Sequence, residues 1–217
     1  LVVPTHVVRH IANELATSLK PGSLIINASK GIENSSLCTI RQILEQALPD
    51  TCDLATLSGP TFAFEVAREI PSAIVAAAET YIQADRIQKI FSCSYLKVFT
   101  SNDPIGVELG GALKNVIAIA TGISDGLQVG NNARAALITR GLAEITRIGI
   151  ALGARAETFA GLSGLGDLVL TCTGELSRNR EVGLRIGRGE KVASIIKSMN
   201  NVAEGVLTVK SAYALKS

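Results

Sequence analysis

The sequence predicts a fold in two parts: an α/β part with a mainly parallel sheet over residues 1–102, and an all-helical part over residues 103–217. Three observations support this. Short apolar runs alternate with amphipathic stretches over the first hundred residues. No convincing strand pattern follows Asp103, and Pro104 stands at the change, where a proline suits the first turn of a helix. With 47% hydrophobic residues, the chain can bury a substantial core.

The elements of the first part follow in order from its apolar runs and its turn residues. The opening LVVPTHVVRHIANEL reads as a strand end, a proline turn and a helix, which Pro21-Gly22 stops. Strands are then expected within residues 23–31, 53–62, 71–79 and 96–103, and helices within 37–48, 63–70 and 81–92. Because strands and helices alternate, the sheet is expected to be mainly parallel and covered on both faces.

The second part contains only helical patterns. Two are long and four are shorter: residues 104–129, 133–153, 165–173, 178–189, 192–199 and 204–215. Apolar residues within them recur at helical spacing, so we expect each to bury one face. No internal repeat and no low-complexity tract is present.

Composition excludes several classes of function. The net charge of +2 gives no argument for nucleic-acid binding, no run approaches ~18 uninterrupted apolar residues, and no signal-peptide pattern is seen. His6 and His10, spaced i, i+4, have no evident third ligand, so we expect a solvated helix face and no metal. The cysteines lack a C-x-x-C pair, and we expect reduced thiols of a cytosolic protein. They are Cys38, Cys52, Cys93 and Cys172.

Lys114 lies in the middle of an otherwise apolar helix. Gly111 and Ala118 flank it one turn each way, and we expect an open slot around the ammonium. A lysine in an apolar recess has a lowered pKa and can act as a general acid or base. The alternative, which this stretch alone favours, is a lysine that reaches solvent or pairs with Glu108 or Asp125. The large side chains form a separate stripe that can face a core: Ile105, Leu109, Leu113, Val116, Ala120 and Ile123.

The stretch SRNR suggests an anion site at a helix N-terminus. Ser177 is a good N-cap, so Arg178 and Arg180 fall in the first turn, where the helix dipole disfavours cations. A bound phosphate would reverse that effect. Two solvated arginines, balanced by Glu181 or Asp167, explain the pattern equally well.

Two further stretches complete the candidate chemistry. GLSGLGDLVLTCTG does not match a dinucleotide loop, but its Asp167 could pair with Lys114 and set its charge state; the alternative is an ordinary loop before a helix. Lys30 in NASKG and the SGPT stretch, residues 58–61, both follow strands, where ligands bind in open α/β sheets. A surface loop lysine is the simpler interpretation of Lys30 alone.

Together, and in this order, these stretches resemble the NAD(P)-dependent glycerol-3-phosphate dehydrogenases of the bacterial and plastid type. The resemblance runs essentially end to end, through VPTH, NASKG, SGPTFAFEVA, GGALKN, GLGDL, SRNR and VAEGVLTVK. It implies a Rossmann-type NAD(P)-binding domain joined to a helical substrate domain like the C-terminal domain of 6-phosphogluconate dehydrogenase. It also implies interconversion of sn-glycerol 3-phosphate and dihydroxyacetone phosphate, which supplies phospholipid synthesis. A cytoplasmic (or plastid stromal) homodimer is expected, without nucleic-acid partners or membrane insertion.

The resemblance assigns roles to individual residues. Lys114 matches the catalytic lysine, which Asn115, Asp167 and Thr171 would orient and tune. Substrate-binding positions, besides Lys114 and Asp167, would be Lys30, Gly59, Thr61, Ser177, Arg178 and Asn179. Cofactor-binding positions would be Lys30, Ala63, Arg178, Val202 and Glu204.

One feature of the family is absent from the 217 residues: the G-x-G-x-x-G turn after the first strand. We therefore expect these residues to contain the second part of the Rossmann-type domain and to stop before the last helices. Alone, they should bind cofactor weakly and be nearly inactive. Two alternatives remain: a related β-hydroxyacid-type dehydrogenase acting on a carboxylate, which SRNR and GLGDL disfavour, and a non-catalytic interaction module, which the presence of Lys114, Asp167 and Arg178 disfavours.

Overall fold

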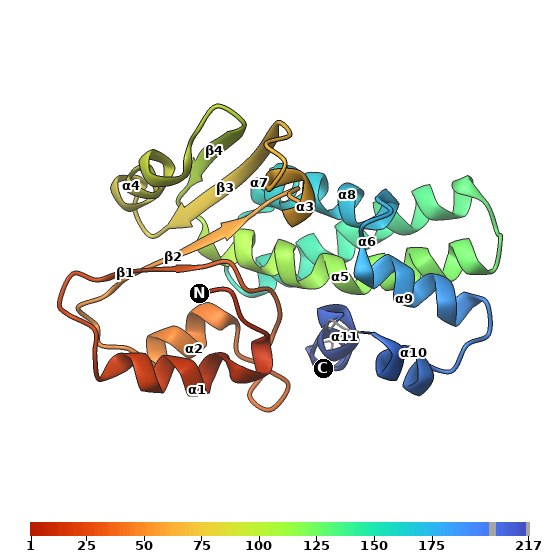
Figure 1. Cartoon of the computed structure of the whole chain (residues 1–217), viewed down its shortest axis with the longest axis horizontal. Coiled ribbons are helices and arrows are strands. Elements are labelled where there is room, and N and C mark those ends of the chain that lie inside the picture. The colour runs from red at the N-terminus through yellow and green to blue at the C-terminus, as the bar shows by residue number, and fades with distance from the viewer. Residues whose placement is uncertain (200–202, 216–217) are drawn as a thin grey trace.

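The computed structural model describes residues 1–199 and 203–215 and has the two parts expected from the sequence (Figure 1). The first part contains α1 (Thr5–Ala16), β1 (Leu24–Asn27), α2 (Ile40–Ala47), β2 (Asp53–Ser58), α3 (Ala63–Val66), β3 (Ser72–Ala78), α4 (Tyr81–Phe91) and β4 (Leu96–Ser101). The second contains α5 (Pro104–Gly126), α6 (Asn131–Ala151), α7 (Ala156–Phe159), the π-helical turn η1 (Leu162–Gly166), α8 (Asp167–Thr173), α9 (Arg178–Gly187), α10 (Val192–Ser198) and α11 (Glu204–Ala214).

The sheet has the order β1-β2-β3-β4 and is mostly parallel, as predicted. β1 pairs with β2 and β3 with β4 in parallel, whereas β2 and β3 are antiparallel, with Ala55 opposite Ala78. The reversal was not predicted. It arises because β2 and β3 are joined through α3, a single helical turn, and not through a full helix that crosses the face of the sheet.

Helices cover both faces of the sheet (Figure 1). Alternate residues of β1 point to opposite sides: Ile26 packs in a cluster with α4, and Ile25 packs against α1 and α2. Val107 of α5 packs against β3 on the face of the sheet that is opposite to α4. The long helix α5 therefore joins the sheet to the helical part.

Several helices begin at residues whose side chains cap the helix N-terminus. Thr39 and Thr80 form capping boxes with Gln42 and Gln83 at the starts of α2 and α4. Asp103 caps α5 by accepting a hydrogen bond from the amide of Gly106 at 2.9 Å. Asp103, where the strand patterns of the sequence give way to helical patterns, is thus the buried N-cap of α5.

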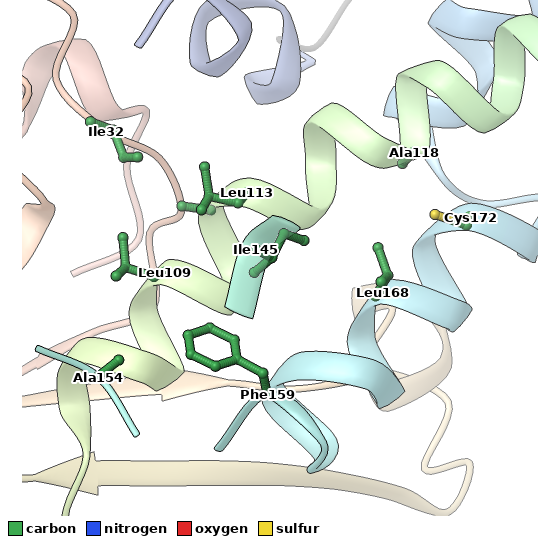
Figure 2. Close-up of a cluster of buried hydrophobic side chains, with 10 residues drawn as sticks. Ile32, Leu109, Leu113, Ala118, Ile145, Ala154, Phe159, Leu168 and Cys172 are labelled. Carbon is green, nitrogen blue, oxygen red and sulfur yellow. The ribbon is translucent and has the colours of Figure 1, made fainter. Parts of the chain in front are cut away.

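The largest core surrounds α5 (Figure 2). Leu109 and Leu113 lie in it, as the predicted stripe requires, but Val116, Ala120 and Ile123 are only half-buried, and Ala118 of the opposite stripe is in the core. The expectation of one core-facing stripe is wrong because helices α6, α8, α9 and α11 pack around α5.

In the described part of the chain, α5 is the helix whose length and composition would allow it to cross a membrane. Its 18-residue window has a mean hydropathy of 1.2, and 78% of that window is buried inside the molecule. Core helices pass the same test.

Smaller differences occur in loops and at element ends. Leu1–Val3 is not a strand, although the amide of Ala28 donates to the carbonyl of Leu1 at 2.9 Å. The helix expected from residue 165 begins as the π turn η1, and the short α7 was not predicted. His6 and His10 are exposed, as expected, and the four cysteines are free.

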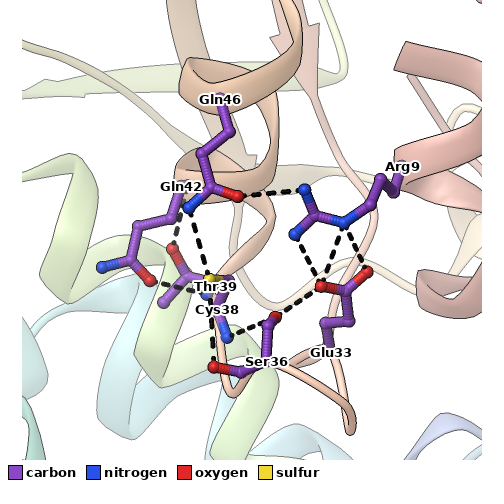
Figure 3. Close-up of polar contacts among 7 residues, drawn as sticks. All are labelled: Arg9, Glu33, Ser36, Cys38, Thr39, Gln42 and Gln46. Carbon is purple, nitrogen blue, oxygen red and sulfur yellow. Dashed lines mark hydrogen bonds and ion pairs between the residues drawn. The ribbon is translucent and has the colours of Figure 1, made fainter. Parts of the chain in front are cut away.

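A polar network fixes the loop between β1 and α2 (Figure 3). Arg9 of α1 donates to Glu33 in the loop, at 3.0 Å from Nε, and to Gln46 of α2, at 2.9 Å from Nη1. The carboxylate of Glu33 also accepts the hydroxyl of Ser36. These contacts hold the segment that immediately follows Lys30.

Candidate functional site

The ammonium of Lys114 is buried, with 6% of the residue exposed. It donates to the carboxylate of Asp167 and, at 2.8 Å, to the hydroxyl of Thr171. That hydroxyl donates in turn to the main-chain carbonyl of Asp167 at 2.7 Å. Because Asp167 and Thr171 are spaced i, i+4 on α8, one face of that helix presents both to Lys114.

The alternative partners considered for Lys114 are wrong. The carboxylate of Glu108 accepts the amide of Arg41 at 3.0 Å, and Asp125 pairs with Arg134 and Arg180. Lys114 does not reach solvent. The predicted pairing with Asp167 is the one observed.

The small residues beside Lys114 bring other side chains close and do not leave an open slot. A Cβ at Gly111 would lie 2.6 Å from Ser58 Oγ and 3.4 Å from Lys30 Cε. At Gly110 it would lie 2.7 Å from the carbonyl oxygen of Ser163. The expected slot is therefore corrected: the glycines admit the ends of β1 and β2 and the turn η1.

Lys30 is brought to the site by the loop after β1. The amide of Ser29 donates to the Asn27 side chain at 2.9 Å, and the Thr5 hydroxyl donates to the Lys30 carbonyl at 3.0 Å. Gly31 has a φ of +145°, and a Cβ there would overlap Thr5, so glycine is required. Lys30 Nζ lies 3.5 Å from the second carboxylate oxygen of Asp167, which has no hydrogen-bond partner among the described residues.

The pKa of Lys114 is lowered to about 8, mainly by burial and also by the positive charge of Lys30. The carboxylate of Asp167 opposes both effects. A group with this pKa is partly protonated near neutral pH, so Lys114 can both donate and accept a proton.

The starts of α9 and α11 meet the middle of α5 at Gly205, where a Cβ would lie 2.7 Å from the Asn179 side-chain oxygen and 2.8 Å from the Asn115 carbonyl oxygen. Burial raises the pKa of the Glu204 carboxyl, and the charges of Lys30, Arg178 and Lys114 act on it in the opposite sense. Glu204 is the first residue of α11 and Arg178 the first of α9. The positive charges of Lys30, Lys114 and Arg178, which come from three separate segments, therefore all act on this carboxylate, and positive charge in one region favours an anion.

The first turn of α9 only partly matches its prediction. Ser177 is the N-cap and accepts the amide of Arg180 at 3.2 Å, as expected, and Arg178 is exposed. Arg180 is neither solvated nor free for an anion, because its guanidinium pairs with Asp125 at 2.7 Å. Asn179 is buried, and its side-chain oxygen accepts the amide of Gly205 at 3.0 Å, which joins α9 to α11.

The loop after β2 lies against η1 and α8. A Cβ at Gly166 would lie 3.6 Å from Pro60, and one at Gly174 would lie 2.7 Å from the Phe62 ring. Gly59 has a φ of +157°, and its carbonyl accepts the amide of Thr61 at 2.8 Å.

The remaining predicted residues are placed as follows. Ala63 is exposed at the start of α3, and Asn115 is 3% exposed beside Lys114. Val202 lies outside the described residues. The structure thus brings Lys30, Lys114, Asp167 and Thr171 into one cluster. The first turns of α9 and α11, which carry Arg178 and Glu204, approach it at Asn115.

Ser58 and Asp125 have no assigned role in the predicted site, although Ser58 belongs to the SGPT stretch and Asp125 is one of the alternative partners considered for Lys114. The Ser58 hydroxyl is buried, has no hydrogen-bond partner in the part of the chain that the structure describes, and points toward Gly111, one turn before Lys114. The sequence signal for it was the glycine itself. Two cavities of about 300 and 160 Å³ border Arg41, and neither is lined by Lys114.

Comparison with known proteins supports the same assignment. Residues 1–84 match the family model for the NAD-dependent glycerol-3-phosphate dehydrogenase N-terminus, and residues 103–217 match the model for the C-terminus. Proteins named glycerol-3-phosphate dehydrogenase [NAD(P)+] from Syntrophotalea carbinolica and Geobacter sp. strain M21 are 57% and 56% identical over 99% of this chain.

A crystal structure of glycerol-3-phosphate dehydrogenase from Coxiella burnetii superposes with a TM-score of 0.94 at 37% identity, over 99% of this chain and 65% of that one. The chain spans 65% and 64% of the lengths of the two sequence relatives. This chain belongs to the NAD-dependent glycerol-3-phosphate dehydrogenase family.

Proposed function

We propose that the full-length protein containing these residues interconverts sn-glycerol 3-phosphate and dihydroxyacetone phosphate with NAD or NADP. The main support is the buried Lys114, bonded to Asp167 and Thr171, with Lys30 beside the same carboxylate and the first turn of α9 nearby. Its relatives are named for this activity. The product would supply phospholipid synthesis.

The residues present fit one side of a nicotinamide dinucleotide site. β1 and β2 run parallel, and ligands bind beyond the carboxyl ends of such strands. The loops at those ends carry Lys30 and Ala63, and a buried carboxylate oxygen of Asp167 that accepts no hydrogen bond from the described residues lies 3.5 Å from the Lys30 ammonium. Contacts with the cofactor are assigned to Lys30, Ala63, Arg178, Val202 and Glu204. When bound, NAD(P) gives or accepts the hydride at C2 of the substrate.

Lys114 handles the proton of this reaction. In reduction, its ammonium donates a proton from Nζ to the oxygen that develops charge at C2; in oxidation, the neutral amine takes that proton from the hydroxyl. Asp167 orients the ammonium, and Thr171 fixes a second of its three N–H bonds. Asn115, buried next to Lys114, is assigned a supporting role in the same site.

The substrate phosphate is assigned to the N-terminus of α9. Arg178 is exposed there, and the helix dipole and free amides favour an anion. Ser177 and Asn179 flank it, and Lys30, Gly59 and Thr61 would contact the remaining part of the substrate. Binding energy from the phosphate then aligns the carbon that reacts beside Lys114.

We assign residues 1–102 to a Rossmann-type cofactor domain and residues 103–217 to the helical substrate domain. Asp103 supports assigning the start of the helical domain to residue 103, because its carboxylate bonds within that domain: it accepts the amide of Arg155 at 3.0 Å and the hydroxyl of Thr158 at 2.6 Å. A cytoplasmic homodimer is part of the same proposal.

Substrate comparison with the full-length protein tests this function. Turnover of dihydroxyacetone phosphate should exceed that of short 2-keto and 3-keto acids by orders of magnitude, and Arg178→Ala should raise KM for the phosphorylated ketone. Faster turnover of the keto acids would instead identify a dehydrogenase for carboxylate substrates. Absence of turnover with every substrate would support a non-catalytic module.

A further inference from the structure

The first turn of α9 is tied to α5 by Asp125. One carboxylate oxygen accepts Nε and Nη2 of Arg180 at 2.9 and 2.7 Å, and the other accepts Nε and Nη2 of Arg134 at 2.8 and 2.6 Å. The Asp125 side chain is only 7% exposed. Charge-assisted bonds of this kind fix direction as well as distance.

The ion pair between Asp125 and Arg180 lies where α5 and α9 cross closely, with glycines on the facing sides of both helices. A Cβ at Gly122 would overlap the carbonyl oxygen of Arg180, and a Cβ at Gly183 would overlap that of Ile119. One turn further on, Gly126 and Gly187 face each other in the same way. Backbone therefore packs directly on backbone, which leaves α9 little room to shift without moving α5.

The same turn carries the residues assigned to the phosphate. Ser177 accepts the amide of Arg180, so Arg178 and Asn179 lie between two residues that are both fixed. Along α5, Asp125 is 125 − 114 = 11 residues beyond Lys114. Eleven residues are about three turns, so both side chains leave α5 on nearly the same side, about 16 Å apart along its axis.

We propose that Asp125 is a positioning residue for phosphate recognition. This inference rests on the proposed function. By holding Arg180, it sets the start of α9 relative to Lys114, so that Arg178 and Asn179 meet the phosphate while Lys114 meets C2. It also keeps the second guanidinium of this turn away from the anion. One helix, α5, thus fixes the distance between the proton-transfer group and the phosphate-binding turn.

The test uses Asp125→Asn in the full-length protein, a change that keeps the shape and removes the charge. KM for dihydroxyacetone phosphate should rise about tenfold, with kcat within about threefold of the parent. KM for the reduced cofactor should rise less, because Arg178 is one of several residues assigned to the cofactor, whereas the phosphate depends on this turn. The matched control is Arg134→Ala, which removes the other partner of the same carboxylate but does not touch α9. It should leave both KM values unchanged.

A binding measurement without cofactor gives a second readout. Glycerol 3-phosphate should raise the melting temperature of the parent, and Asp125→Asn should reduce that rise, whereas glycerol should affect both proteins equally. If Asp125→Asn does not fold, Arg180→Gln tests the same contact from α9 and should give the same KM pattern.

Two results would overturn the inference: unchanged KM in the variant that folds, or a parallel loss in kcat and in KM for both substrates that follows the loss of stability. Failure of the proposed function looks different, because the parent itself would then not turn over dihydroxyacetone phosphate. If the parent is active and the Asp125 and Arg180 variants keep its KM, only this inference fails.

Discussion

Changing the two charges next to Lys114 should move the pH dependence of turnover in opposite directions. Asp167→Asn removes the carboxylate that raises the pKa of Lys114, and Lys30→Met removes the cation that lowers it. Asparagine keeps an oxygen acceptor at the Asp167 position, so the geometry around Nζ changes little. The pH profile then reports on the charge alone.

The magnitude follows from the pKa of about 8, compared with the ordinary lysine value of 10.5. A charge within ~4–6 Å changes a pKa by ~1–3, so Asp167→Asn should bring the pKa of Lys114 to roughly 5–7. At pH 7, the neutral fraction of Lys114 should then rise from about a tenth to half or more. Lys30→Met should raise the pKa above 8 and shrink that fraction.

The assay is kcat for glycerol 3-phosphate oxidation as a function of pH in the full-length protein. Since the neutral amine is the base, the rate should rise through the pKa of Lys114, at lower pH for Asp167→Asn and at higher pH for Lys30→Met. The exposed Lys97→Met serves as the control and should keep the parent midpoint. Midpoints that do not move, or that move together, would refute the assignment of Lys114 as the proton-transfer group.

Two further predictions concern stability. Burial raises the pKa of Glu108 from 4.5 to about 7. Between these pH values the folded protein keeps a proton that the unfolded chain loses. The free energy of unfolding should therefore fall by about 3 kcal/mol as the pH rises from 4.5 to 7. Glu108→Gln should flatten this slope in urea denaturation, whereas Glu144→Gln, at a side chain that is 47% exposed, should not. Equal slopes in all three proteins would contradict the raised pKa of the buried Glu108 carboxyl. Gly111→Ala should cost about 1–3 kcal/mol because its Cβ would lie 2.6 Å from Ser58 Oγ. Ser58→Ala in the same protein should recover part of that loss, and an additive double variant would show that the two side chains do not collide.

Most elements could be predicted from local patterns. The capping residues Thr39, Thr80 and Asp103 mark helix starts in the sequence because their side chains bond to amides a few residues away. Strand direction could not be predicted in the same way: the apolar runs of β2 and β3 are the same for parallel and antiparallel pairing. The short α3 is the feature that decides it.

The candidate site shows a similar limit. The pairing of Lys114 with Asp167 was one of several possibilities, and only packing excludes Glu108 and Asp125 as partners. Gly111 was interpreted as empty space, although a glycine predicts a close neighbour as readily as a gap. Arg180 was grouped with Arg178 because both lie in one turn, but the crossing of α5 and α9 directs only Arg180 toward Asp125.

The most direct test of the account is Lys114→Ala in the full-length protein, measured with saturating dihydroxyacetone phosphate and reduced cofactor. We predict that kcat falls ~10²–10⁴-fold, because the proton-transfer group is lost. Substrate binding should largely be kept through α9, and small primary amines in the buffer should restore part of the rate. Unchanged turnover in a correctly folded Lys114→Ala protein would contradict the account.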